Sequence, residues 1–224
     1  MFRDLLSFWK GKDFLVHVMD DFKIMLDDTE LMFTFVCSQL IEGAHESGLK
    51  DKIYKIDKKV NGLEREIRRR IVEHLTMQPK VGVNVCLLLM SVVKDAERLG
   101  DYSKNLYGVT ELLDKPVNKT VFAQYFDDLD KEILDLFGQT RDAFINADEE
   151  KARSAWEYHR KINRTCDKIV ETLVSSDLSV NEAVCFALIA RYFKRIVSHL
   201  VNIATSVVLP LSDLDYFDES KAEE

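Results

Sequence analysis

The stretch KDAERLGDYSKNL, at residues 94–106, places two carboxylates, Glu97 and Asp101, four residues apart on a segment with helical spacing. Residues four apart share one face of a helix, and at about 100° per residue that face also carries Val93. Both acids therefore continue an inward, apolar stripe, where unpaired charges are costly. Gly100 lies between them and would let a neighbouring helix approach closely. The stretch predicts a long, packed helix with a polar site on its inner side.

The remainder of the chain shows the same helical pattern. Apolar residues recur at helical spacing almost throughout, and no segment has convincing strand alternation. Only 3 prolines and 8 glycines occur in 224 residues, which favours long helices. The breaks between the periodic segments contain residues that stop helices. The pattern predicts six long helices, at residues 13–45, 50–75, 81–108, 118–146, 148–175 and 180–209.

The six helices form two sets of three that resemble each other. The matching segments are DKKVNGLEREI with HRKINRTCDKI, at residues 57–67 and 159–169, and AERLGDYSKNL with FKRIVSHLVNI, at residues 96–106 and 193–203. Both matches need a shift of about 100 residues, which indicates an internal repeat. We therefore expect an all-α fold of two tandem antiparallel three-helix bundles. The first would span residues 1–115 and the second residues 116–224.

Composition narrows the class of protein. Hydrophobic residues make up 46% and charged residues 31%, as in a globular chain with a sizeable core. The net charge of −8 argues against sequence-independent nucleic-acid binding, which needs a basic surface. The uncharged runs at residues 81–93 and 196–212 are expected to be buried helices, because a bilayer span takes about 20 apolar residues. Four cysteines are expected to be reduced core thiols: Cys37, Cys86, Cys166 and Cys185.

The helix before the opening stretch offers further polar groups. Asp57, Asn61 and Glu64 lie at positions i, i+4 and i+7, on one face of that helix. Across the hairpin, Asp57 and Asp101 reach similar heights. A set of oxygen ligands without Cys or His favours a hard or borderline cation such as Mg, Ca, Mn or Fe. We therefore predict one metal site, for iron, manganese or magnesium, formed by Asp57, Asn61, Glu64, Glu97 and Asp101.

A network of salt bridges is the alternative for these residues. Glu64 can pair with Arg68, four positions along the same helix. Lys94 and Lys104 lie within reach of Glu97 and Asp101. The spacing alone does not separate a metal site from such a network.

At these positions the sequence resembles the PhoU family of phosphate-uptake regulators. The family pattern is an acidic residue followed by KxVNxLE on one helix and ERIGDxxxNI on the next, given twice. The likeness extends over nearly the whole chain. It implies two PhoU-type three-helix bundles and a cytoplasmic regulator, not an enzyme. Such a protein would work at the inner face of the membrane, with a phosphate transporter and a sensor histidine kinase as partners. We further expect a homodimer, peripheral membrane association and no nucleic-acid partner.

The resemblance also bears on the metal. Some family members bind iron or other metals through E-x-x-x-D motifs, which correspond here to Glu97 and Asp101, with Asp57 on the partner helix. The second repeat departs from the pattern at four positions, which hold His159, Lys194, Val197 and Ser198. Because a lysine ammonium repels a cation, we predict that the second site is empty. His199 lies nearby and is expected to be packed or at the surface instead of acting as a ligand.

Two other classes of protein remain as alternatives. A carboxylate-bridged di-iron enzyme would use E-x-x-H motifs, and the chain has one such match, at Glu42 and His45. A metal-free helical scaffold would need none of these ligands. Neither a nucleophile elbow nor a Walker A motif occurs. The segment at residues 1–12 places apolar side chains near one face, either to pack on the bundle or to lie on a membrane.

Overall fold

The computed structural model describes residues 13–43 and 47–216. These residues form seven α-helices, a π-helix, a short 3-10 helix and no strand. The segment at residues 1–12 and His45 lie outside the described residues, so the expectations placed on them stay predictions. The α-helices are α2 (Asp13–Cys37), α3 (Leu49–Met77), α4 (Val83–Leu112), α5 (Lys119–Phe126), α6 (Leu129–Asn146), α7 (Glu149–Leu173) and α8 (Val180–Thr205).

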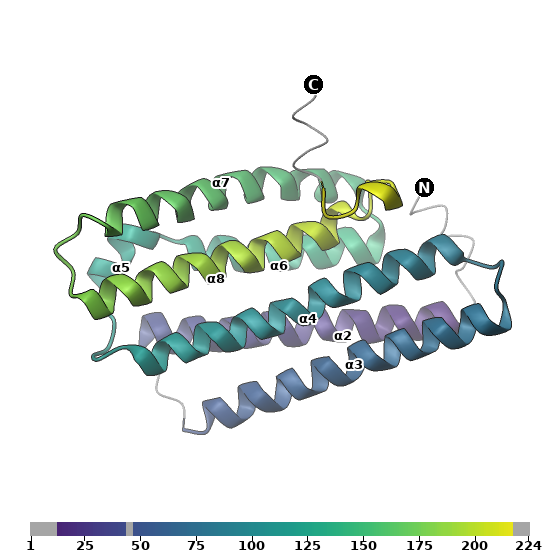
Figure 1. Ribbon diagram of the computed structural model, residues 1–224, viewed down its shortest axis with the longest axis horizontal. Helices are drawn as coiled ribbons and strands as arrows, with labels where there is room; N and C mark the ends of the chain where they lie inside the picture. Colours follow the sequence, from purple (N-terminus) through teal and green to yellow (C-terminus); the bar gives the residue numbers. More distant parts are fainter. Residues whose placement is uncertain (1–12, 44–46, 217–224) are drawn as a thin grey trace.

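The long helices form two antiparallel three-helix bundles that lie side by side, as the sequence predicts. Helices α2, α3 and α4 pack together in the first bundle, and α6, α7 and α8 in the second. In Figure 1, α3 and α7 lie at the outer edges, with α4 and α8 between them. Across the boundary, α4 packs against α8 and α2 packs against α6. Helix α4 therefore contacts helices of both bundles.

One predicted helix, at residues 118–146, is wrong, because it is broken into α5 and α6. The break lies at Asp127, whose φ of 49° cannot continue an α-helix. Aspartate tolerates a positive φ better than most residues. The break lets α5 turn aside, so that Phe122 and Phe126 each contact the ring of Phe186 on α8 at 5.6 Å between centroids. The aromatic contacts give the short helix a place in the core.

Side-chain caps fix where several helices begin. The Asn118 side chain accepts hydrogen bonds from two backbone N–H groups at the start of α5, and Asp148 does the same for α7. At α8, Ser179 accepts from the backbone N–H of Glu182, and its hydroxyl donates to the carboxylate of that residue. These contacts satisfy N–H groups that have no partner within the helix.

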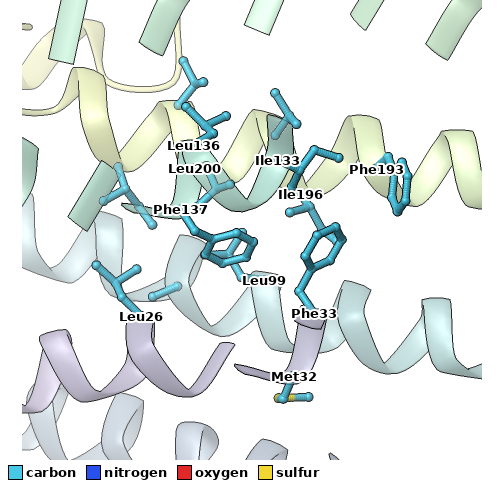
Figure 2. Close-up of a cluster of buried hydrophobic side chains, with 14 of the residues drawn as sticks. Leu26, Met32, Phe33, Leu99, Ile133, Leu136, Phe137, Phe193, Ile196 and Leu200 are labelled. Carbon is cyan, nitrogen blue, oxygen red and sulfur yellow. The ribbon is translucent and has the colours of Figure 1, made fainter. Parts of the chain in front are cut away.

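The two bundles share one continuous core. Phe33 of α2 lies 5.7 Å from the ring of Phe137 on α6 and 5.6 Å from that of Phe193 on α8. Figure 2 shows these rings in one cluster with Leu99 of α4 and Leu200 of α8. The side chains are fully or almost fully buried. Because this cluster includes side chains from both repeats, a displacement of α4 would disturb the side-chain packing of the second bundle.

Other expectations drawn from composition are met within the described residues. All four cysteines are free and buried. None of the described helices is both long enough and apolar enough to span a bilayer.

Candidate functional site

The five residues predicted as metal ligands lie on two adjacent helices. Asp57, Asn61 and Glu64 belong to α3, and Glu97 and Asp101 belong to α4, which packs against it. We call these five residues the α3–α4 seam. Asp57 is buried, and the other four are half-buried. The structure therefore places the predicted set along the boundary between two helices of the first bundle.

The electrostatics of Glu97 show how near the seam carboxylates lie to one another. Burial raises the pKa of the Glu97 carboxyl above its ordinary value, and the charge of Asp101 raises it further. The neighbouring Arg98 opposes the shift, while Glu64 and Asp57 on the other helix add to it. A carboxylate surrounded by like charges and partly withdrawn from water holds its proton more tightly.

Lys104 lies between the two helices of the seam. Its ammonium donates a hydrogen bond of 2.9 Å to Asp57 Oδ1 and one of 3.1 Å to Asp101 Oδ1. One lysine thereby bridges α3 and α4 through the two carboxylates expected to lie at similar heights. The sequence placed Lys104 near Asp101, and its contact with Asp57 was missed. That contact depends on how a long, flexible side chain turns, which helix spacing does not fix.

Arginines neutralise other carboxylates of the seam. Arg98 donates a 2.8 Å hydrogen bond to Asp101 Oδ2, and Arg68 lies 2.8 Å from Glu64. Arg98 also lies 3.6 Å from Glu97. Of the predicted salt-bridge network, the Glu64–Arg68 and Lys104–Asp101 pairs are confirmed, whereas the contacts of Arg98 were not predicted.

The seam has oxygen donors that suit a hard cation, but the ammonium of Lys104 lies between two of them. Carboxylate oxygens are the ligands such cations prefer. As they stand, no three His, Cys, Asp or Glu side chains within residues 13–43 and 47–216 are grouped to hold a metal ion. The Oδ1 atoms of Asp57 and Asp101 are both hydrogen-bonded to the ammonium of Lys104. The residue types thus suit a hard cation, and to hold one the carboxylates would have to turn towards each other as Lys104 moves away.

The second bundle has different chemistry at the equivalent positions. His159 replaces Asp57 and accepts a 2.8 Å hydrogen bond from Asn163. Lys194 replaces Glu97, and its ammonium bonds both oxygens of Asp167 on α7, at 2.7 and 2.8 Å. A groove of about 670 Å³ runs between α7 and α8 beside this pair. A lysine–carboxylate pair therefore stands where the first bundle has a cluster of acids.

The two repeats also contact each other through equivalent positions on α4 and α8. His199 of α8 donates a 2.7 Å hydrogen bond to Asp95 of α4. In the repeat alignment, Asp95 corresponds to Tyr192, and His199 corresponds to Tyr102. The contact equivalent to Asp95–His199 is therefore Tyr192–Tyr102, and these two rings do lie together, with 6.1 Å between their centroids. These two contacts are related by the internal repeat, which supports its register. His199 is thus a packed histidine, as predicted.

Asp95 faces α8 instead of the seam. It is 6% exposed, since α8 covers it. Asn202 adds a second hydrogen bond to the same Asp95 oxygen, at 3.1 Å. The sequence did not indicate this partner, because the docking of two bundles is not encoded in the spacing along either helix.

Comparison with known proteins gives consistent matches over most of the chain. A family model described as the PhoU domain matches residues 22–109 and 126–207. The "Phosphate-specific transport system accessory protein PhoU homolog 1" of Thermotoga maritima is 25% identical over 212 residues, covering 86% of this chain and 88% of the relative. The corresponding PhoU homolog of Synechocystis sp. is 26% identical over 177 residues, covering 75% of this chain and 76% of that protein.

Solved structures show the same fold. The crystal structure of PhoU from Pseudomonas aeruginosa gives a TM-score of 0.76 at 22% identity, covering 87% of this chain and 95% of that one. The phosphate transport system regulatory protein PhoU from Streptococcus pneumoniae gives a TM-score of 0.71 at 16% identity, covering 88% and 95%.

Proposed function

Because this chain belongs to the PhoU family, we propose that it is an accessory protein of phosphate transport, a regulator that acts by binding instead of by catalysis. The observation that carries the proposal is the pair of PhoU domain matches, one on each repeat. Both curated relatives described above are named as accessory proteins of a phosphate-specific transport system.

The partner we propose is a membrane phosphate transporter, with a sensor histidine kinase as a second partner. The protein would work as a homodimer at the cytoplasmic face of the membrane, associated with it peripherally. The relatives' names support the transporter, and the kinase and the dimer are extensions from the family resemblance. A di-iron enzyme would need two E-x-x-H motifs, and the sequence offers one, at Glu42 and His45, of which His45 lies outside the described residues.

We propose further that the α3–α4 seam takes one metal ion, either iron, manganese or magnesium. Asp57, Glu97 and Asp101 would hold it, with Asn61 and Glu64 at its edge. A bound cation would neutralise carboxylates that otherwise repel one another, and would thereby fasten α3 to α4. The raised pKa of Glu97, caused first by its burial and then by Asp101, supports the proposal, because it marks a charge that lacks full compensation.

The position of α4 offers a route from the seam to the second bundle. Glu97 lies two residues from Asp95, which accepts the hydrogen bond of His199 on α8. A shift of α4 that follows a change at the seam would therefore act directly on the contact between the repeats. In this way one bound ion would change the relative placement of two surfaces that partners contact.

The transporter association can be tested in the protein's own host. The chain, carrying an affinity tag, is isolated after brief crosslinking from cells grown with high and with low phosphate, and bound proteins are identified by mass spectrometry. We expect phosphate-transporter subunits in amounts that differ between the two conditions. A control strain without the transporter genes should lose the signal. Recovery of no transporter subunit in either condition would reject the proposal.

A further inference from the structure

We propose that Lys104 is a built-in counter-ion of the seam, which holds it closed in the metal-free protein and which a metal ion must displace. The inference rests on the metal site proposed above and goes beyond it, because it assigns a role to a residue that is not a ligand. It makes the seam a two-state element, bridged either by the lysine ammonium or by a metal.

The position of the ammonium carries the inference. Lys104 bonds Asp57 on α3 and Asp101 on its own helix, so it spans the same gap that a metal would span. It uses the Oδ1 atom of each carboxylate. A cation that took these oxygens as ligands would stand against a positive charge at contact distance, which is strongly unfavourable in a partly buried place. The two cations therefore exclude each other.

The lysine side chain is able to leave. Lys104 is 24% exposed, and a lysine has a flexible four-carbon stem that can carry its ammonium into water. Arg98 and Arg68 bind their carboxylates from more exposed positions, with 44% and 41% of their side chains accessible. Arg98 uses the other oxygen of Asp101, Oδ2, and Arg68 contacts Glu64, so neither arginine needs the Oδ1 atoms that Lys104 holds.

The charge balance favours exchange over permanent closure. Four carboxylates, those of Asp57, Glu64, Glu97 and Asp101, face three cations, those of Lys104, Arg98 and Arg68. One negative charge is left in excess. The guanidinium of Arg98 lies 3.6 Å from Glu97, which is long for an ion pair. A divalent ion in place of Lys104 would bring one more positive charge into this cluster.

The second bundle shows what the same seam looks like without exchange. Its ammonium comes from Lys194, which holds Asp167, while the position equivalent to Lys104 is the buried Val201. Ser198 and His159 stand where the first bundle has Asp101 and Asp57. The two carboxylates that Lys104 bridges in the first bundle therefore have no counterpart at the equivalent positions here. Each repeat thus carries one bridging lysine at its seam, and only in the first do the acids for an alternative cation persist among the described residues.

The test uses full-length protein stripped with a chelator, which is then removed. Lys104→Met keeps the length of the side chain and deletes the charge, and Lys104→Gln is a second variant with a polar end. Lys58→Met is the matched control, since Lys58 is an exposed lysine next to Asp57 in sequence and the substitution removes the same charge. Binding of Mn²⁺ is measured by titration calorimetry, and thermal unfolding is measured with and without Mn²⁺.

We expect both Lys104 variants to bind Mn²⁺ about tenfold more tightly than the native chain or more, because an opposing charge has left the gap. Without metal, both should unfold at a lower temperature than the native chain, and Mn²⁺ should raise their unfolding temperature by more than it raises that of the native chain. Lys58→Met should match the native protein in both measurements.

Two results would overturn the inference. The first rejects only the role of Lys104, and the second also rejects the metal site. If the native chain binds Mn²⁺ and the Lys104 variants bind it equally or more weakly, Lys104 does not compete, and the proposed metal site stands without it. If neither the native chain nor the variants bind Mn²⁺, Fe²⁺ or Mg²⁺, the inference fails together with the metal site, while the transporter association is tested separately by crosslinking.

Discussion

His199 on α8 donates a hydrogen bond of 2.7 Å to Asp95 on α4, and so joins the two repeats of the chain. Replacing His199 by alanine would leave a carboxylate that is 6% exposed with Asn202 alone as its described partner. We expect the free energy of unfolding to fall by about 1 to 3 kcal/mol, as measured by urea denaturation. Arg195→Ala, at an exposed position on the same helix, should stay within about 0.5 kcal/mol of the native chain. An equal loss of unfolding free energy in both variants would show that this hydrogen bond stabilises the fold no more than an exposed side chain does.

Gly100 is predicted to accept alanine. A Cβ atom added there would lie 3.6 Å from Thr29 and 3.8 Å from Met32, which are ordinary van der Waals distances. Because alanine has the higher helix propensity, Gly100→Ala should raise the free energy of unfolding by up to about 1 kcal/mol. The reverse change in the same helix, Ala96→Gly, should lower it. A loss of more than 1 kcal/mol in Gly100→Ala would mean that α2 and α4 cannot accommodate even a methyl group.

Glu97→Gln should have opposite effects on stability and on metal binding. Burial and the charge of Asp101 raise the pKa of Glu97 in the folded state, so its ionisation costs stability. The contribution of Glu97 to the stability of the native chain is therefore fully present below its pKa in the unfolded state. It is lost as the pH rises through the raised pKa of the folded state. In metal-free protein, the variant should unfold at a higher temperature than the native chain at pH 7, and this advantage should shrink towards pH 4.

The same variant should bind Mn²⁺ more weakly, since it lacks a proposed ligand. Glu111→Gln, on the same helix but paired with Lys50 outside the seam, provides a comparison of equal charge change. If Glu97→Gln binds Mn²⁺ as well as the native chain does, Glu97 is not a ligand.

The cysteines are predicted to be unreactive in the folded protein. Burial raises the pKa of Cys86 to about 11, and burial followed by the charge of Asp167 raises that of Cys166 to about 12. The thiolate is the reactive species, so little of it exists at pH 8. Ellman's reagent should report slow labelling of the native chain and rapid labelling of all four thiols in guanidinium. Rapid labelling under native conditions would contradict the burial of at least one cysteine.

The helices and the repeat were accessible from the sequence because both depend on local periodicity. Where the pattern failed, at Asp127, apolar residues keep helical spacing on both sides of the break, and a single backbone angle interrupts the helix. The five residues of the seam were also found from helix geometry alone. The bridge from Lys104 to Asp57 was missed, because spacing fixes the face of a helix but not the direction of a long side chain. The partner of Asp95 was missed as well, since it belongs to another bundle.

If the chain regulates phosphate transport, its loss must alter phosphate uptake in its own host. Initial uptake of radiolabelled phosphate is measured at high external phosphate in cells without the gene, in wild-type cells and in cells with the gene restored. We predict that loss of the chain changes the rate of uptake and that the restored gene returns it to the wild-type value. Equal uptake in all three strains would show that the chain does not regulate phosphate transport.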